Sequence, residues 1–372
     1  MVDRDVLADA VGWVARALPA RPPSPVLTGV KVKAETEDGG KVTLASFDYE
    51  VSAKIEIGAD VEDAGQALVS GRLLAEIAKL LPAKPVTFQL EGAKAVVTCG
   101  SSTFTLLTMP LDDYPALPVL PSAVGAIEAG RFASAVGQVA VAATRDETLP
   151  LLTGVRVEIE GEKLTFLATD RYRLAIKELT WKPTSPDVSR VALVRARTLS
   201  EVAKAFGHTE EIEVSLTAPG IADIIGFAAA GRETTSLLID GEYPQVRKLL
   251  PDTFDNAAVL AVTPLIEAVR RVSLVAERNT PVQIAFSEGE AVLNAGTGDD
   301  AQASEVLQAD VTSPITVAFN PHYLLEGLSV IDAPSVRLSM TSATRPVLFQ
   351  GEADGQVKPD YRYLLVPIRF TV

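Results

Sequence analysis

The sequence predicts an α+β protein made of three repeated domains, each with two helices packed on antiparallel sheet. Three observations lead to this prediction. Short sequence markers recur in the same order along the chain, apolar residues at helical spacing occur twice in each repeat, and short alternating runs fill the remainder. The three domains are expected at residues 1–121, 122–251 and 252–372.

The first two of these markers share one spacing between the first and second repeats. An apolar run after a proline occurs at residues 25–30 (PVLTGV), 150–155 (PLLTGV) and, more weakly, 281–286 (PVQIAF). A second run carries a leucine that recurs at equal steps, as Leu74, Leu199 and Leu324. Each repeat then closes on a tyrosine motif, at residues 113–115 (DYP), 242–244 (EYP) and 360–362 (DYR). Ordered markers at this distance indicate repeated domains, because solenoid turns are much shorter.

Each repeat is expected to open with an amphipathic helix, as Leu7, Val11, Val14 and Leu18 illustrate in the first repeat. The opening helices are predicted at residues 4–19, 130–143 and 263–278. A second helix is predicted in each repeat, at residues 71–81, 195–207 and 319–331. Alternating runs bounded by Gly, Asp and Glu, such as KVTLA at residues 41–45 and KLTFL at residues 163–167, predict hairpin strands.

The composition is that of a soluble globular protein: 372 residues, 47% of them apolar and 22% charged. Cys99 is the single cysteine, so no intramolecular disulfide can form, and the first residues do not resemble a secretory signal. The uncharged stretch at residues 132–144 is too short to span a bilayer. We therefore expect a cytoplasmic protein without a membrane segment.

The net charge of −14 argues against a protein that coats nucleic acid with its whole surface. The charge is unevenly distributed, however, because the six predicted helices are together slightly basic and the strands and loops carry all of the negative excess. If the helices line one common surface, that surface would favour phosphates while the others repel them. The alternative is that these lysines and arginines are ordinary solvated charges on exposed helix faces.

An enzyme is the main alternative class, and its usual signatures are missing from the sequence. No Walker A, G-x-S-x-G, H-E-x-x-H or G-x-G-x-x-G motif follows a predicted strand. His208, His322 and Cys99 are too few to build a zinc site, so we expect no metal and no cofactor. The acidic pairs at residues 112–113 and 299–300 leave a carboxylate-dependent hydrolase as an alternative, although such loop pairs are usually solvated.

With these features in place, the chain resembles the bacterial sliding clamp, the beta subunit of DNA polymerase III, along essentially its full length. The resemblance rests on four segments, at residues 21–27 (RPPSPVL), 168–174 (ATDRYRL), 241–251 (GEYPQVRKLLP) and 363–370 (YLLVPIRF). The loop at residues 296–305 resembles that of actinobacterial members. The resemblance implies a head-to-tail homodimeric ring whose inner wall is made of helices and whose outer wall is continuous sheet.

The same resemblance implies a non-catalytic processivity factor that encircles double-stranded DNA without sequence preference. An ATP-dependent clamp loader would place it on DNA, where it would tether the replicative polymerase, repair polymerases and ligase through short apolar peptides. A clamp paralogue that titrates a drug or a partner is the alternative. The cations expected to face DNA, each of which could instead be a solvated charge, are Arg21, Arg72, Lys79, Arg145, Arg197, Lys204 and Arg278.

Comparison of the repeats indicates which copy has specialised. LASFDYEV at residues 44–51 corresponds to LATDRYRL at residues 167–174, where two arginines replace Asp48 and Glu50. The apolar C-terminal run is a second unusual feature, because chain ends usually fray in water. By resemblance, both belong to one peptide-binding groove per chain, whose arginines can hydrogen-bond a peptide. The groove residues would be Leu152, Thr169, Arg171, Tyr172, Arg173, Leu174, Pro244, Leu249, Pro346, Val366, Pro367 and Ile368.

Some of the residues assigned to the groove and to the dimer interface have an alternative interpretation. The alternative for Leu152, Leu174 and Leu249 is that they are core residues, and branched Val366 and Ile368 stand where some family members have methionine. The dimer interface is expected to bury Phe104 and Leu106 of the first repeat against the opening helix of the third near Leu274, and the alternative is that Phe104 and Leu106 are core.

Overall fold

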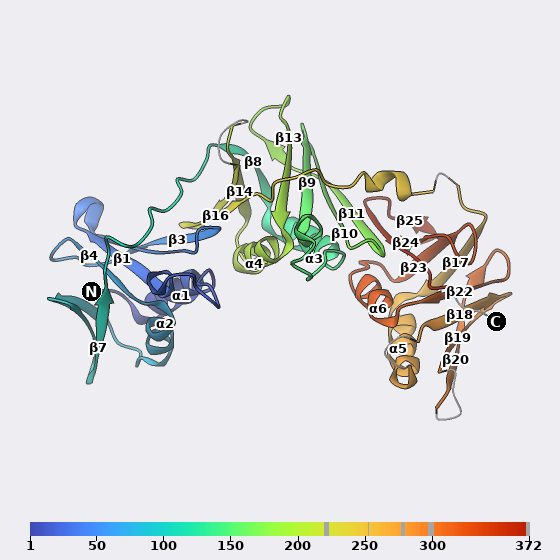
Figure 1. Cartoon of the computed structure of the whole chain (residues 1–372), viewed down its shortest axis with the longest axis horizontal. Helices are drawn as coiled ribbons and strands as arrows, with labels where there is room; N and C mark the ends of the chain where they lie inside the picture. Colours follow the sequence, from blue (N-terminus) through green and yellow to red (C-terminus); the bar gives the residue numbers. More distant parts are fainter. Residues whose placement is uncertain (219–222, 252, 277–279, 297–300, 370–372) are drawn as a thin grey trace. The chain divides into compact units, whose positions relative to one another are not determined.

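The computed structural model, drawn in Figure 1, describes residues 1–218, 223–251, 253–276, 280–296 and 301–369. The chain divides into two compact units. Unit one comprises Met1–Gly130, Lys182–Ser185 and Lys204–Leu238. Unit two comprises Arg131–Trp181, Pro186–Ala203 and Ile239–Val372. The predicted second repeat is therefore divided between the two units, and each unit is described by itself below.

Unit one is built on a 12-stranded sheet with the strand order β12-β8-β14-β15-β16-β3-β2-β1-β4-β7-β6-β5. Its strands are β1 (Gly29–Glu35), β2 (Lys41–Phe47), β3 (Val51–Gly58), β4 (Gly65–Ser70), β5 (Val86–Glu91), β6 (Lys94–Cys99), β7 (Ser102–Met109), β8 (Ala123–Glu128), β12 (Lys182–Pro183), β14 (Glu211–Leu216), β15 (Ile224–Ala229) and β16 (Arg232–Leu237). β16 of the second repeat pairs antiparallel with β3 of the first, with Arg232 opposite Ile55. The sheet thus continues across the predicted boundary at residue 121.

Two helices of unit one come from the first repeat, α1 (Arg4–Ala15) and α2 (Gly71–Leu80). Asp3 caps α1 by accepting the backbone N–H groups of Asp5 and Val6, which satisfies donors that the first turn leaves unpaired. α1 ends at Ala15 and not at residue 19 as predicted, because Pro19 has no N–H to donate to the Ala15 carbonyl and its ring would clash with that carbonyl. The apolar face of α1 is buried, as the predicted spacing required.

Unit two contains a 10-stranded sheet with the order β13-β9-β10-β11-β26-β24-β23-β17-β21, to which β25 is joined through β24, and a 4-stranded sheet with the order β20-β19-β18-β22. The strands of the large sheet are β9 (Gly154–Glu160), β10 (Lys163–Thr169), β11 (Arg173–Thr180), β13 (Ser189–Arg195), β17 (Asn256–Ala261), β21 (Asp310–Val311), β23 (Ser335–Met340), β24 (Val347–Ala353), β25 (Gln356–Val357) and β26 (Tyr361–Leu365). Those of the small sheet are β18 (Val282–Ser287), β19 (Glu290–Ala295), β20 (Ala303–Gln308) and β22 (Ile315–Phe319).

The large sheet of unit two also joins two repeats. β11 of the second repeat pairs antiparallel with β26 at the end of the third, with Arg173 opposite Leu365 and Leu174 opposite Leu364. This pairing mirrors the β16–β3 pairing of unit one. The C-terminal run that looked prone to fraying is therefore a central strand of a sheet up to Leu365.

The remaining helices are α3 (Ala129–Ala140), α4 (Ala196–Phe206), α5 (Val262–Val272) and α6 (Pro321–Ser329). Asn320 caps α6 by accepting the N–H groups of His322 and Tyr323 at 2.9 and 3.3 Å. Gly327 lies so close to the Tyr363 ring that a Cβ there would come within 2.2 Å of it, so α6 can pack on β26 only with glycine at this position. All six predicted helices are confirmed, with two in each repeat of the described chain.

Candidate functional site

Apolar side chains of unit two form a buried cluster that includes two predicted groove residues, Leu152 and Leu174. Leu152 is 7% exposed and Leu174 only 2%. The other buried members come from five strands of the large sheet and from the segment after residue 239, and they are Leu167, Ile176, Leu193, Tyr243, Val246, Leu348 and Leu364. Leu152 and Leu174 are therefore core residues, and only their edges can form the floor of a surface groove.

The tip of the β10–β11 hairpin is fixed by its own polar side chains. Asp170 Oδ1 accepts the N–H groups of Tyr172 and Arg173 at 3.0 and 3.1 Å. The hydroxyl of Thr169 accepts the N–H of Arg171 at 3.2 Å and donates to the Arg173 carbonyl at 2.6 Å. Arg171 has a φ of +82°, which is uncommon outside glycine. The hairpin thus presents Arg171 and Tyr172 to solvent, with Tyr172 53% exposed.

Arg173 is turned inward instead. Its Nε donates to Asp170 Oδ2 at 2.9 Å, NH1 donates to Glu326 of α6, and the guanidinium carbon lies 4.3 Å from the centre of the Tyr323 ring. Burial disfavours the charge, yet Tyr363, Glu326 and Asp170 more than offset this and raise the pKa of Arg173 above its ordinary value. Only one of the two predicted arginines, Arg171, is therefore left at the surface.

Sequence reasoning missed Tyr323 and Glu326, which α6 brings to the site. The Tyr323 ring stacks on that of Tyr172, with centroids 6.1 Å apart and an interplanar angle of 24°. An aromatic residue just after the helix cap was visible in the sequence, but nothing there indicated that it would meet the hairpin of the second repeat. We include Tyr323 in the candidate site because its ring packs against that of exposed Tyr172.

The residues after β26 are held in place by two backbone bonds. The N–H of Val366 donates to the Tyr172 carbonyl at 2.9 Å, and that of Ile368 donates to the Ala318 carbonyl at 2.7 Å. Pro367 is buried, Ile368 is half-buried and Val366 is exposed. Residues 366–368 therefore form one wall beside the hairpin tip, with Val366 presented to solvent.

A second wall comes from the segment that covers the cluster, which contains the short 3-10 helix η4 (Val246–Leu249). Tyr243 anchors the segment, because its hydroxyl accepts the Thr169 N–H at 3.0 Å. Pro244 is exposed and Leu249 is 53% exposed, while Pro346, before β24, is half-buried. Thus Leu249 is a surface residue, in contrast to the core leucines at positions 152 and 174.

The cations predicted to face DNA are exposed wherever they are described, namely Arg21, Arg72, Lys79, Arg145, Arg197 and Lys204. Arg72 and Lys79 lie on α2, and Arg197 and Lys204 lie on α4. Arg72 also donates to the carbonyl of Pro19, two residues before Arg21 in the sequence, at 3.1 Å. Arg278 lies outside the described residues.

The residues predicted for the dimer interface differ in exposure. Phe104 on β7 and Leu274, in the 3-10 helix η5 (Ser273–Val275) after α5, are exposed. Leu106, in contrast, is 3% exposed and packs inside its own unit, whereas its neighbour Leu107 is 72% exposed. The strand register thus places the Leu107 side chain, and not that of Leu106, at the surface of unit one.

No catalytic constellation emerges from the described part of the chain. Asp112 and Asp113 are exposed loop residues, and the pair at residues 299–300 lies outside the described residues. Within the described ranges, no group of three or more His, Cys, Asp or Glu side chains is arranged to hold a metal ion. No helix in these ranges is long and apolar enough to cross a membrane.

Three family models match the chain in succession. The N-terminal domain of the DNA polymerase III beta subunit matches residues 1–118, the central domain residues 126–245, and the C-terminal domain residues 247–367.

Similar proteins agree with these matches. The beta sliding clamp of Streptomyces coelicolor is 50% identical over 100% of this chain and 99% of its own length. A beta sliding clamp homologue named GriR from Streptomyces muensis is 44% identical over 99% of this chain and 98% of its own. A crystal structure of the Pseudomonas aeruginosa sliding clamp bound to griselimycin has a TM-score of 0.91 and 25% identity, and the match covers 99% of this chain and 98% of that one.

Proposed function

The chain belongs to the DNA polymerase III beta subunit family and is a non-catalytic DNA sliding clamp of three α+β domains, and we propose that it works as a head-to-tail homodimeric ring with one peptide groove per chain. The observation that carries the groove is the arrangement in unit two. Tyr172 is exposed at the tip of a rigid hairpin, and the backbone of exposed Val366 bonds to it. Leu249 is exposed on the segment whose Tyr243 and Val246 pack into the buried leucine cluster. Apolar surface of this kind is stabilised when a short apolar peptide covers it and displaces water.

The groove would bind through a few side chains. Leu152, Leu174 and Pro367 form the floor, Thr169 and Arg173 hold the hairpin, and the rim consists of Arg171, Tyr172, Pro244, Leu249, Pro346, Val366 and Ile368. Each leucine-sized side chain of a peptide that becomes fully buried contributes about 1.5–3 kcal/mol. Three such anchors would supply about 4.5–9 kcal/mol before the cost of ordering the peptide, so polar contacts must add to them to reach about micromolar affinity, which needs about 8 kcal/mol. Arg171 supplies donors for peptide carbonyls or acids.

DNA would be held by charge alone. The cations proposed to face the duplex are Arg21, Arg72, Lys79, Arg145, Arg197, Lys204 and Arg278, with the last outside the described residues. Because the chain as a whole carries −14, phosphates would be repelled from most other surfaces. Contacts of this kind do not distinguish bases, so binding would be independent of DNA sequence and would weaken with salt.

Ring closure would cover apolar surface on both units. β5 is the edge strand of the 12-stranded sheet, and the nearby β7 exposes Phe104 and Leu107. Leu274 is exposed beyond α5 of unit two. A head-to-tail contact between the two patches would remove an open sheet edge that otherwise favours aggregation.

We further propose that an ATP-dependent clamp loader places the ring on DNA in the cytoplasm, without any cofactor bound to the clamp itself. The replicative polymerase, repair polymerases and ligase would then compete for the groove through short apolar peptides. The hairpin of the first repeat that corresponds to β10–β11 carries Asp48 and Glu50 in place of the two arginines, so we expect no second groove there. The partners would therefore compete for one groove per chain.

A second candidate is a clamp paralogue that titrates a drug or a partner, and the 44% identity to the GriR homologue favours keeping it. The two functions differ in a reconstituted reaction with the replicative polymerase and clamp loader of the same organism. The proposed function predicts longer products per binding event in the presence of the wild-type chain. Product lengths equal to those without a clamp, in a reaction that another clamp of that organism stimulates, would favour the paralogue.

A further inference from the structure

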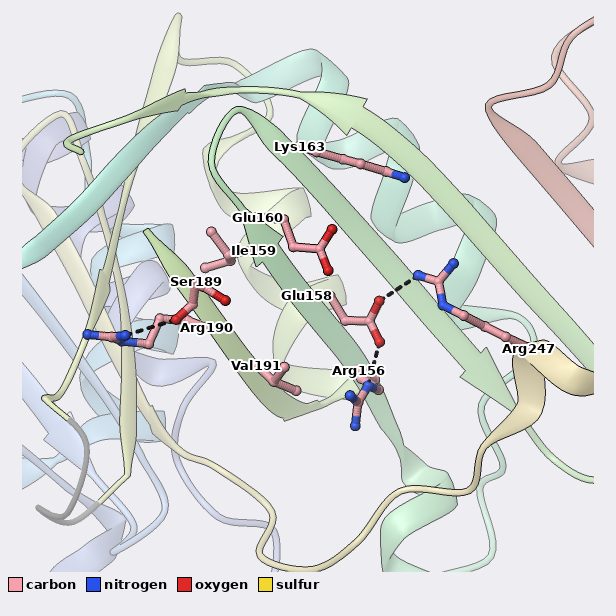
Figure 2. A pocket seen from close by; sticks show the side chains of 9 residues that line it. All are labelled: Arg156, Glu158, Ile159, Glu160, Lys163, Ser189, Arg190, Val191 and Arg247. Carbon is pink, nitrogen blue, oxygen red and sulfur yellow. Dashed lines mark hydrogen bonds and ion pairs between the residues drawn. The ribbon is translucent and has the colours of Figure 1, made fainter. Parts of the chain in front are cut away.

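Unit two has a hollow of about 310 Å³ on the surface of β9, β10 and β13, beside η4 (Figure 2). Its charged lining consists of Arg156, Lys163, Arg190, Arg247, Glu158 and Glu160, and we call it the basic hollow. In Figure 2 the Glu158 carboxylate lies between the guanidinium groups of Arg156 and Arg247, whereas Arg190 points to the far side, where it donates to the Ser189 carbonyl. None of these residues belongs to the proposed groove.

Cations outnumber carboxylates here. Glu158 pairs with Arg156 at 2.7 Å and with Arg247 at 2.5 Å. Glu178, on neighbouring β11, pairs with Lys163 at 3.1 Å and with Arg362 at 2.5 Å. Two carboxylates are thus shared among four cations, and Glu160 reduces the surplus on this face to one positive charge, because Arg190 points to the far side. In a chain with a net charge of −14, this surplus makes the surface of the hollow locally basic.

The paired carboxylates orient the cations without using all their donors. Burial raises the pKa of Glu158, but hydrogen bonds from Arg156 and Arg247 outweigh it and hold the pKa below its ordinary value. Glu158 is therefore ionised at neutral pH and fixes both guanidinium groups. Each guanidinium has five N–H donors, and one from each is bonded to Glu158, so further donors remain for an anion.

The basic hollow continues the face that carries the groove. Arg156 lies opposite Leu167 on β10 and Leu193 on β13, and residues opposite each other project from the same face of a sheet. Both leucines belong to the apolar cluster beneath the groove. Arg247 lies on η4 between Val246, which packs into this cluster, and Leu249 on the groove rim. A bound chain that leaves the apolar cluster along β9 would meet Arg156 and Arg247 next.

We propose that the basic hollow binds acidic side chains in the segment that flanks the apolar core of a docking peptide on one side. This inference rests on the proposed groove function. It adds that the chain recognises acidic residues beside the apolar core of the peptide as well as the core itself. Carboxylates are the complementary group, because a planar guanidinium pair binds them through charge-assisted hydrogen bonds. The hollow lies open on the sheet, which suits side chains of a passing peptide.

The test uses the full-length chain and synthetic peptides with one apolar core, selected on the wild-type protein. Each core carries a tail of three glutamates or of three glutamines, at either end, and the dissociation constant is measured by fluorescence anisotropy at 50 and 500 mM NaCl. The variant is Arg247→Gln, with Lys163→Gln as a second variant should the first fold poorly. The matched control is Arg270→Gln, because Arg270 is an exposed cation of α5 that does not line the hollow.

We expect the glutamate tail to bind about three- to fivefold more tightly than the glutamine tail at 50 mM NaCl, at one end only. The gain should vanish at 500 mM NaCl and in Arg247→Gln, and persist in Arg270→Gln. Equal affinities for both tails in the wild type, or a gain that survives in both hollow variants, would overturn the acidic flank and leave the groove standing. Failure of every peptide to bind would overturn both proposals.

Discussion

The guanidinium of Arg173 lies 4.3 Å from the centre of the Tyr323 ring, while its Nε and NH1 bond to Asp170 and Glu326. One arginine thereby ties the β10–β11 hairpin of the second repeat to α6 of the third. Tyr172 stacks on the same tyrosine from the hairpin side. The position of the exposed groove residues in unit two therefore depends on a buried ion pair beneath them.

Replacing Arg173 with methionine should destabilise unit two by about 3 kcal/mol. The change leaves the carboxylates of Asp170 and Glu326 without their cation in a buried setting, which costs more than the lost contact itself. Urea unfolding measures the loss, and Arg270→Met on exposed α5 is the control. Surface substitutions typically change the unfolding free energy by no more than about 0.5 kcal/mol. If the unfolding free energies of Arg173→Met and Arg270→Met differ by less than that, the role given to Arg173 is refuted.

The exposed groove residues give a cleaner test of peptide binding than the buried ones. Leu249→Ala and Tyr172→Ala should each weaken an apolar peptide about five- to tenfold without lowering the unfolding temperature, because both side chains are about half exposed. Tyr49→Ala is the matched control, since Tyr49 is a similarly exposed tyrosine at the hairpin tip of the first repeat. Isothermal titration calorimetry would measure all three, and unchanged affinity in both groove variants would reject the assignment.

Leu174→Asp should also abolish peptide binding without opening the dimer, but its mechanism differs. Leu174 is buried, so an aspartate there would place a charge in the apolar cluster and destabilise unit two. Calorimetric unfolding should therefore reveal a lower transition temperature together with the lost binding. Full retention of the transition temperature would mean that the site is more open than its burial indicates.

The dimer edge gives a fourth prediction. Phe104→Asp, Leu107→Asp and Leu274→Asp should each convert the dimer to monomers at micromolar concentration, because each would bury a carboxylate in an apolar contact. Light scattering after gel filtration reports the mass, and Val119→Asp, at a highly exposed position away from both patches in the sequence, should remain dimeric. A wild-type chain that is a monomer at all concentrations would contradict ring closure.

Acid should weaken unit two through Glu158 in the basic hollow and Glu178 beside it. The pKa values of Glu158 and Glu178 are lowered from 4.5 in the fold, because hydrogen bonds from their cations outweigh burial. A carboxyl group whose pKa is lower in the folded than in the unfolded chain stabilises the fold at pH values above its unfolded pKa. That stabilisation is lost as the pH falls through its folded pKa. The unfolding free energy of the wild type should thus fall below pH 5 more steeply than that of Glu158→Gln/Glu178→Gln. Parallel curves would contradict this.

Much of the fold was predictable from the sequence because it depends on local pattern. Helical spacing located all six helices, and the repeat markers located corresponding strands. The overestimate at the end of α1 has a local cause, Pro19, which the apolar spacing of Leu18 obscured. The domain boundaries stay a prediction, because the compact units follow the continuous sheets, which cross from one repeat to the next.

The site was less predictable, because its geometry comes from residues far apart in the chain. The sequence indicated two arginines beside Tyr172, but only the position of Glu326 and Tyr323 turns Arg173 inward. Likewise, an alternating strand pattern does not tell which of Leu106 and Leu107 points outward, since register across β7 decides it. The basic hollow was not anticipated, because Arg247 meets Glu158 only once η4 covers the sheet.

Retention on circular DNA tests the encircling ring most directly. The protein is loaded on a nicked plasmid with its clamp loader and ATP, separated from free protein by gel filtration, and the plasmid is then cut once. The account predicts that the clamp stays with the intact circle, leaves after linearisation, and is retained again when bound proteins block both ends. Continued retention on linear DNA with free ends would contradict it.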